Sequence, residues 1–266
     1  MSLKSIVKCV TLAGWVAFAT GAMADGGPSR SVRDPGPPPF TWTGIYVGLN
    51  AGYAWADAQN SLEPLGQYRT AAFGPAFYAG NGSSAQTLKG FTGGGQAGMN
   101  YQMGALVLGF EVDANIMRVD ASRSVSAFNP AAAAAYRFDT SNKIDALYTI
   151  RPRIGYAFGT AMVYLTGGLA IADRTFSQTM TCVTLATCGV NNFDAISVNK
   201  YAFGWTIGAG FEYAFNRNWT MKTEYLYADL GTFAANSVNS TAAQFSTGNR
   251  NDLTVQTVRA GINYKF

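Results

Sequence analysis

The chain has 266 residues, of which 48% are hydrophobic and 14% aromatic, while only 13% are charged. An average soluble domain carries about 25% charged residues, so this chain is poor in charge without being apolar overall. Its 30 glycines favour a β-rich protein over a long helical one, its lack of histidine excludes histidine-dependent hydrolases, and about 250 residues can form a single β domain.

The first 24 residues have the features of a secretory signal peptide. Lys4 and Lys8 precede an apolar run from Val10 to Ala19, and small residues flank the bond after Ala24. A transmembrane anchor needs about 20 apolar residues, which this run does not reach. Cleavage after Ala24 would remove Cys9 and lower the formal net charge from +4 to +2, because two lysines and no acids are lost. The remaining charge gives no support for nucleic-acid binding.

Residues 25–39, with the sequence DGGPSRSVRDPGPPP, are rich in proline and glycine and have no periodic face. This composition predicts a flexible or polyproline tether. We predict that this tether is periplasmic and that the folded domain follows it at 40–266.

Eight segments with a two-residue alternation follow the tether. In the first, WTGIYVGLNAGYAW, Ile45 and Val47 alternate with Gly48 and Asn50. A usual strand has about 5 or 6 residues, whereas a strand that crosses a bilayer at a tilt needs roughly 9 to 11. The alternation here, about 12 to 16 residues in each segment, is long enough to cross. The eight segments are approximately 42–57, 88–102, 105–118, 144–157, 161–175, 200–215, 218–231 and 252–266.

The connections between these segments alternate in length. Those containing QMGA, FGT and NRN are tight, as in hairpins, whereas the other four run to about 20 or 30 residues, an arrangement typical of outer-membrane proteins. In hydrocarbon every backbone N–H and C=O group must be paired within the protein, so only helices and closed barrels can span. We therefore predict an all-β fold, an eight-stranded antiparallel up-and-down transmembrane β-barrel with four long extracellular loops. The face with Ile45 should meet lipid, and the face with Gly48 should line the lumen.

Aromatic residues are frequent near the strand ends and in the loops. Those expected in the interfacial girdles are Trp42, Trp55, Tyr148, Tyr201, Trp219 and Tyr264. Loop aromatics either contact partners or pack over the mouth of the barrel, and they include Tyr68, Phe73, Phe77, Tyr78, Phe128, Tyr136 and Phe138. The segment PAAAAAYRF near Ala131 could form a short helix, although a marginal one in isolation.

Two cysteines, Cys182 and Cys188, lie in the segment CVTLATC between the fifth and sixth predicted strands. An exported chain meets an oxidising compartment, and this spacing can close a small ring, so we predict a structural disulfide. A metal site is disfavoured, because the chain has no histidine and no second cysteine pair.

The predicted inner faces carry nearly balanced charges. An eight-stranded barrel is just wide enough for its own side chains, and charges in such an enclosure are tolerated only when they are paired and hydrogen-bonded. We therefore predict an ion-pair network that plugs the lumen, with an ion pathway as the alternative. The residues concerned are Glu111, Asp113, Glu212 and Glu224 against Arg151, Arg153, Lys222, Arg259 and Lys265.

Carboxylates near arginines could also suggest acid–base catalysis. No nucleophile elbow or phosphate-binding loop accompanies them, and the glycines of FTGGGQAG lie within a strand pattern. We therefore predict no enzyme activity, no catalytic residue, no metal and no cofactor.

Several stretches together resemble a known family. They are WTGIYVGLNAGYAW, GGGQAGMNYQMGALVLGFEVDAN, RPRIGYAFGTAMVYLTGGLA, GWTIGAGFEYAFNRNWTMKTEYLYADLG and VRAGINYKF. Their order and spacing resemble the small OmpA-like, opacity-type outer-membrane barrels of alphaproteobacteria, often called porin-family proteins. The resemblance implies eight strands, periplasmic termini, insertion by the barrel assembly machinery, and a C-terminal aromatic assembly signal that would include Tyr264 and Phe266.

Three functions remain open at this point. The first is a structural and surface-interaction barrel of the bacterial outer membrane, whose partners would be membrane lipid, lipopolysaccharide, the assembly machinery and host or surface ligands at the loops, and not nucleic acid. The second is a small passive pore for ions or solutes. The third, implied by the resemblance because some relatives are described as haemin-binding, is haemin capture. Haem iron usually takes histidine, cysteine, methionine or tyrosine ligands, and only tyrosines, methionines and one cysteine pair are present here.

Overall fold

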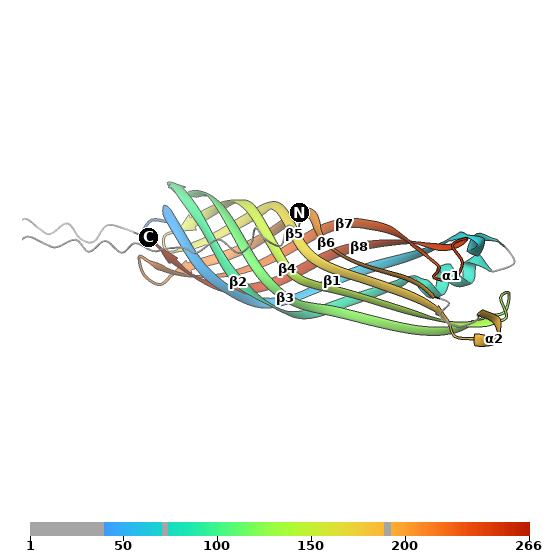
Figure 1. The fold of residues 1–266 in the computed structure, drawn as a ribbon. Coiled ribbons are helices and arrows are strands. Elements are labelled where there is room, and N and C mark those ends of the chain that lie inside the picture. Colours follow the sequence, from blue (N-terminus) through green and yellow to red (C-terminus); the bar gives the residue numbers. More distant parts are fainter. Residues whose placement is uncertain (1–39, 71–73, 189–192) are drawn as a thin grey trace, which may run out of the picture. The chain divides into compact units, whose positions relative to one another are not determined.

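The computed structural model describes residues 40–70, 74–188 and 193–266, and these form a closed barrel of eight strands (Figure 1). Each strand pairs antiparallel with its neighbours in sequence, and β8 closes the ring onto β1. The predicted eight-stranded up-and-down barrel is confirmed. The segments predicted as signal peptide and tether, as well as Phe73, lie outside the described residues. The strands are β1 (Gly44–Gly66), β2 (Ser84–Met103), β3 (Leu106–Asn129), β4 (Ala134–Phe158), β5 (Ala161–Cys182), β6 (Phe193–Ala214), β7 (Trp219–Val238) and β8 (Phe245–Lys265).

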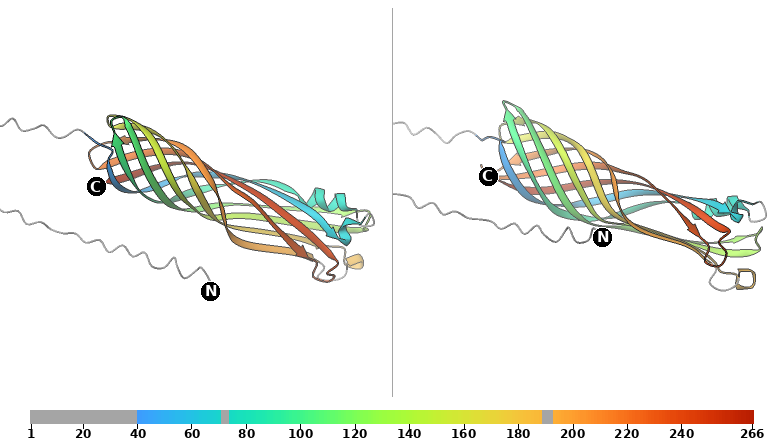
Figure 2. Two further views of the ribbon diagram at one scale, coloured as in Figure 1. Left: turned by 90° about the horizontal axis from the view of Figure 1, so that it is seen from above. Right: turned by 45° about the horizontal axis from the view of Figure 1, so that its top comes forward.

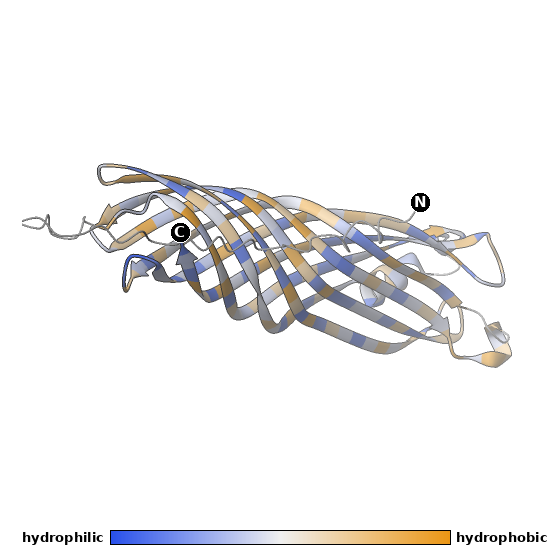
Figure 3. Cartoon of the chain, turned by 60° about the vertical axis from the view of Figure 1, so that its left-hand side comes forward, coloured by the Kyte–Doolittle hydropathy of each residue, from blue (hydrophilic) through white to orange (hydrophobic). Residues whose placement is uncertain are grey.

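The two faces of the strands follow the predicted alternation. Leu49 and Phe91 point outward with 69% and 75% of their surface exposed, whereas Asn50 is inside and 6% exposed. Hydrophobic and hydrophilic residues accordingly alternate along the ribbons in Figure 3. The outward hydrophobic residues of the predicted segments form an apolar belt around the barrel. Toward the end of the barrel at which residues 67–83 connect β1 to β2, the upper limit of this belt is formed by Tyr53, Phe91, Ile116, Tyr148, Leu169, Tyr201, Tyr225 and Val258.

The two ends of the barrel differ in their connections. At one end, the turn end, residues 104–105, 159–160 and 215–218 form the short connections. At the other, the loop end, η2 (Gln67–Arg69) and α1 (Pro75–Gly82) join β1 to β2, and α2 (Leu185–Cys188) follows β5. Figure 2 shows from two further sides that the strands extend as far as the end that carries α1. No helix in the described part of the chain is long and apolar enough to cross a membrane.

The strands are longer than predicted, and three of the four predicted long loops are much shorter in the structure, whereas residues 67–83 still connect β1 to β2. The strands have 20 to 25 residues, and the connection from β3 to β4 consists only of residues 130–133. Beyond the apolar belt the outward residues become polar, so the apolar alternation stops. The backbone groups of neighbouring strands are already aligned there and continue to pair, and the barrel wall extends well past the belt.

The helix predicted near Ala131 is also wrong. Asn129 pairs with Ala134 across the β3–β4 hairpin, which leaves only four residues for the turn. Ala133 adopts a positive φ of 50° in that turn, and the alanines that follow continue as β4. The helix of this region is instead α1, which begins with Pro75 in its first turn, a position that suits the fixed φ of proline.

Most of the predicted girdle residues point outward, but Trp42 does not. Tyr201 and Trp219 are 44% and 42% exposed, whereas Trp42 is 1% exposed. Its indole N–H donates to the carbonyl of Gly159 at 3.1 Å, and its ring packs edge-on against Phe40 at 5.0 Å. Trp42 precedes β1, so the alternation of the strand does not determine its direction, and it closes the turn end from inside.

The barrel wall is incomplete between β6 and β7. These strands pair from Ala214 and Thr220 up to Trp205 and Asp229, where the pairing stops. A register shift in β7 follows immediately and contains Gly231, with a φ of +67°. Bulges of this kind bend a strand away from its partner. β7 remains paired with β8 up to Val238, and near the loop end an isolated bridge joins Asp194 of β6 to Asn239, the residue after β7. We call this interruption the β6–β7 slot.

Candidate functional site

The lumen contains a buried group of charged side chains, the charged cluster. It consists of Glu111, Asp113, Glu212 and Glu224 with Arg151, Arg153, Lys222 and Arg259, all with side chains 0–3% exposed. Strand register places Glu111 opposite Arg151, Glu212 opposite Lys222 and Glu224 opposite Arg259. The structure thus brings together eight of the nine residues of the predicted network, with four acids facing four bases.

Two arginines form the centre of the charged cluster. Arg151 contacts Glu111 at 2.7 Å, Asp113 at 2.8 Å and Glu224 at 3.1 Å. Arg259 contacts Asp113 at 3.0 Å and Glu224 at 2.6 Å. Asp113 and Glu224 are therefore each shared between two guanidinium groups, and the charges compensate one another within the low-dielectric interior, as buried ions require.

Other pairs cross the lumen instead of following the sheet. Lys222 lies opposite Glu212 in the register, yet its ammonium contacts both carboxylate oxygens of Glu111 at 2.7 Å. Glu212 is instead paired with Arg153 at 3.1 Å. The barrel is narrow enough for long side chains to reach the opposite wall. Lys265, predicted on the same face, lies apart at the turn end, where its ammonium contacts the Thr41 carbonyl and sits 4.5 Å from the Phe40 ring.

Two tyrosines complete the charged cluster and were not predicted. Tyr46 donates to Glu111 at 2.7 Å, and Tyr164 donates to Glu224 at 3.0 Å. Their rings lie 4.8 and 5.1 Å from the guanidinium carbon of Arg153, which is thus stacked between two aromatic faces. In the sequence each tyrosine occupies an inward position. Each is paired with a glycine on the next strand, Gly98 or Gly210, and this pairing is the signal that could have identified them.

Neutral side chains fill much of the remaining hydrogen-bonding capacity. Thr149 donates to Asp113 at 2.5 Å. Glu212 accepts from Thr220 at 2.5 Å and from the amide of Asn263 at 2.9 Å. Asn100 accepts from the Arg153 Nε at 2.8 Å. These contacts fix the carboxylates in place, which suits a structural core better than a mobile proton or ion path.

A second layer in the lumen is apolar and was also missed. This apolar layer lies next to the charged cluster toward the loop end, and its members are at most 3% exposed. Outward neighbours of these members include Asp57, Lys89 and Arg118, so the alternation that signals a polar lumen, apolar outward and polar inward, is reversed here. Most members of the layer are small or branched. The members are Ala54, Ala56, Ala58, Leu88, Met117, Val119, Ile144, Leu147, Ala170, Ala172, Ala228, Leu230, Leu253 and Val255.

Aromatic residues of the loop end form a third group, the loop-end cluster. Tyr68, Tyr78 and Tyr136 are at most 6% exposed, and the rings of Tyr78 and Tyr136 meet edge-on at 5.2 Å. They pack with Leu62, Ala134, Phe138, Met180 and Cys182. Most of the predicted loop aromatics therefore lie over the barrel mouth, although Phe128 is 61% exposed. A disulfide joins Cys182 of β5 to Cys188 of α2 beside this cluster.

Asp194 lies beside the loop-end cluster, beyond the apolar belt, and is 2% exposed. Burial raises the pKa of its carboxyl from its ordinary value to about 6, although the neighbouring Tyr68 and Asn239 side chains act in the opposite direction. The folded state therefore holds this proton more tightly than the unfolded chain does. The resulting stabilisation is complete below about pH 4, the ordinary range of the group, and is lost as the pH rises through about 6.

We expect the loop end to open more readily at pH 8 than at pH 5. Hydrogen exchange of the β6 residues after Asp194, corrected for the intrinsic effect of pH on exchange, measures this opening. Asp194→Asn should remove most of the difference, whereas Asp139→Asn, at an exposed ion pair of β4, should leave it unchanged. Equal pH dependence in all three proteins would contradict the assignment to Asp194.

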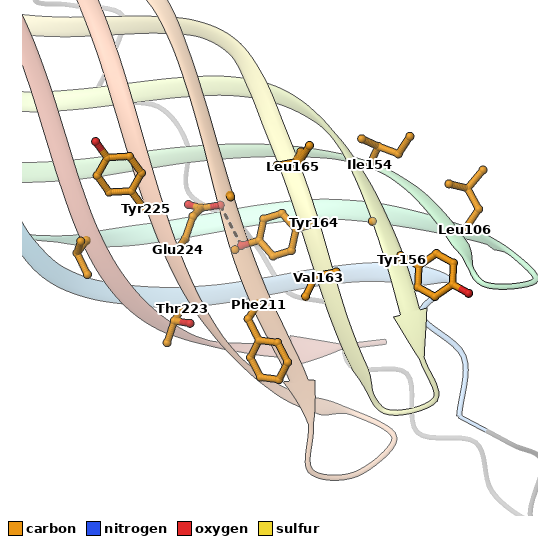
Figure 4. Close-up of a pocket in the computed structure, with 14 residues that line it drawn as sticks. Leu106, Ile154, Tyr156, Val163, Tyr164, Leu165, Phe211, Thr223, Glu224 and Tyr225 are labelled. Carbon is orange, nitrogen blue, oxygen red and sulfur yellow. Dashed lines mark hydrogen bonds between the residues drawn. The ribbon is translucent and has the colours of Figure 1, made fainter.

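The outer wall carries an open apolar depression of about 810 Å³ across β3 to β8 (Figure 4). Its walls include Tyr156, Leu165 and Phe211, which are 44–61% exposed. Figure 4 also shows the Tyr164–Glu224 hydrogen bond as a dashed line. The depression lies within the apolar belt and offers a surface for acyl chains. Among the described residues, no group of three or more histidine, cysteine or acidic side chains is arranged to hold a metal ion.

Outer-membrane proteins of other bacteria are similar in sequence to this chain. The chain is 35% identical to the 31 kDa outer-membrane immunogenic protein of Brucella melitensis, over 98% of this chain and all of that protein. It is 27% identical to a 22 kDa outer membrane protein of Rhizobium leguminosarum, over 77% and 81% of the two chains. The crystal structure of OprG from Pseudomonas aeruginosa aligns with a TM-score of 0.47 and 13% identity, over 85% and 98% of the two chains. The model of the outer membrane protein beta-barrel domain matches residues 12–266, and the chain therefore belongs to that family of outer-membrane proteins.

Proposed function

We propose that this outer-membrane protein is a closed structural barrel that contributes to envelope integrity and presents its loop end for surface interactions. The observation that carries this proposal is that the charged cluster and the apolar layer follow one another along the lumen and both fill it. The charged cluster is neutral as a whole, and its side chains are at most 3% exposed. The residues of the apolar layer beside it are also at most 3% exposed. An ion following the barrel axis would have to break several ion pairs and then enter a hydrocarbon-like zone, which is costly for any charge.

The proposal also includes an orientation. Both chain ends of the barrel lie at the turn end, where Phe266 donates its backbone N–H to Ile45 at 3.0 Å. Outer-membrane barrels have short periplasmic turns and longer connections outside, so the turn end would face the periplasm. Tyr264 and Phe266 then lie at the periplasmic rim, where the assembly machinery would meet them.

Haemin capture gains no support from the loop-end cluster. Tyrosine is the haem ligand that this chain offers in greatest number. At the loop end, Tyr68, Tyr78 and Tyr136 are buried against one another, and burial raises the pKa of Tyr136, which opposes the phenolate form that would bind iron.

We expect refolded protein in a planar bilayer to give no discrete conductance steps. The reason is the high cost of moving an ion through the apolar layer. The matched control is the double variant with Leu147→Ser and Met117→Ser, which should hydrate the apolar layer and leave the charged cluster unaltered. Steady wild-type currents whose size changes with Glu111→Gln or Arg151→Gln would overturn the proposal and favour an ion pathway.

A further inference from the structure

One arginine of the barrel stands apart from the paired charges of the lumen. Arg174 of β5 is 5% exposed, and both of its terminal nitrogens lack a hydrogen-bond partner within the described residues. Arg151 and Arg259, at similar burial, each contact two or more carboxylates. A guanidinium group stays charged at any physiological pH, and a buried charge without a partner is costly. The position of Arg174 therefore calls for an explanation that the charged cluster does not provide.

A second cation lies directly beside Arg174. Lys200 of β6 is its partner in the strand register, and like charges opposite one another destabilise a sheet. Both cations also approach the same ring, since Arg174 lies 5.3 Å and Lys200 5.1 Å from the centre of Phe233 of β7. Cation–π contacts of this kind hold the two groups in place, but they do not satisfy the N–H donors.

The two cations border a cavity at the β6–β7 slot. Its volume is about 220 Å³, and its lining includes Arg174, Lys200, Leu230, Thr232 and Phe233. The β7 register shift with Gly231 separates the strands at this point, so the cavity lies where the ladder between β6 and β7 is interrupted. Asp252 attracts Arg174 electrostatically, but it accepts a hydrogen bond from Thr232.

We infer that this cavity, here called the slot site, binds the phosphate group of a membrane amphiphile. A phosphate offers several oxygens to a planar guanidinium group, which can bind it in bidentate fashion, and to an ammonium group. It would satisfy the Arg174 donors and separate the two like charges. The volume suits a head group of this size and not a larger polar ligand.

The height of the slot site along the barrel indicates that the phosphate belongs to a lipid. Lys200 and Arg174 lie one residue beyond Tyr201 and Asp173 in the register, directly past the upper limit of the apolar belt. Tyr201 and Phe203, which also line the cavity, point outward and are 44% and 65% exposed. A phosphate held by Arg174 can thus keep its acyl chain against these rings, with the head group at the polar boundary of the membrane.

Binding can be measured by native mass spectrometry of the refolded full chain in a neutral maltoside detergent. The probes are dodecyl phosphate, inorganic phosphate and dodecanol. We expect one dodecyl phosphate per barrel, with affinity at least tenfold higher than that of inorganic phosphate, and no specific binding of dodecanol. Inorganic phosphate binding as tightly as dodecyl phosphate would assign the site to a soluble ion and overturn the lipid assignment, and no phosphate binding at all would overturn the site itself.

Three variants locate the binding. Arg174→Met should weaken dodecyl phosphate binding at least tenfold. Lys200→Glu, at an exposed position that should not impair folding, supplies an internal carboxylate to Arg174, so it should abolish binding and raise the thermal unfolding midpoint. Arg250→Met removes an exposed cation of β8 and should leave the affinity unchanged. Equal losses in all three proteins would indicate general electrostatic attraction and overturn the slot site.

Discussion

Arg151→Met is expected to lower the free energy of unfolding of the barrel by about 3–5 kcal/mol, the usual cost of removing one partner from a buried ion pair. Arg151 joins three carboxylates, those of Glu111, Asp113 and Glu224. Methionine fills similar space but leaves the charged cluster with one uncompensated negative charge. Urea-induced unfolding of the refolded protein, followed by tryptophan fluorescence, measures the change.

Two comparisons test the reason for this loss. Arg137→Met removes the same charge from the same strand, but Arg137 and its partner Asp139 are 53% and 38% exposed, so the expected change is within about 1 kcal/mol. Combining Arg151→Met with Glu224→Gln restores neutrality, and the double variant should therefore be less destabilised than the sum of the single variants. Additive losses, or equal effects of Arg151→Met and Arg137→Met, would show that charge balance does not stabilise this lumen.

The parts of the fold that follow from alternation could be predicted from the sequence. Outward bulk and inward polarity repeat every two residues within the apolar belt because lipid lies on one side and the lumen on the other. That contrast identified the eight strands, their order and the inward direction of Glu111, Arg151 and the other members of the charged cluster. It could not identify the partners, because partners are chosen across the lumen by side-chain reach, as Lys222 and Glu111 demonstrate.

The remaining parts lack the periodic signal of apolar residues outward and polar residues inward. Past the belt the outward residues are polar, so the extensions of β3 and β4 into a four-residue turn do not show this signal. In the apolar layer the alternation is reversed, since inward Leu88 lies between outward Thr87 and Lys89, and this reversal hid Leu88 and the other members of the layer. Trp42 lies before β1 and is directed by packing against Phe40 and the turn carbonyl of Gly159. In each case the structure depends on contacts between segments far apart in the chain.

Gly210→Ala should strongly destabilise the barrel. A Cβ atom at this inward position would clash with the ring and hydroxyl of Tyr164 and approach the carbonyl oxygen of Thr223 to 2.8 Å. Overpacking of this kind costs about 1–3 kcal/mol. Displacing Tyr164 would also break its hydrogen bond to Glu224, and hydrogen bonds to charged groups are worth about 1.5–3 kcal/mol. Gly210→Ala should therefore lower the urea midpoint strongly.

Gly95→Ala provides the matched control, because the nearest atoms to its Cβ would be at 3.6 and 4.0 Å, in ordinary contact. Alanine is the better strand residue, so this variant should be neutral or slightly stabilising. In a Tyr164→Ala background the space above Gly210 is free, and most of the cost of Gly210→Ala should disappear. If the cost of Gly210→Ala persists in that background, the contact of the new Cβ with the Thr223 backbone causes it, and the contact with Tyr164 does not. A cost that disappears instead establishes why a glycine faces each tyrosine of the charged cluster: the ring needs the room of the missing side chain to reach its carboxylate and cover Arg153.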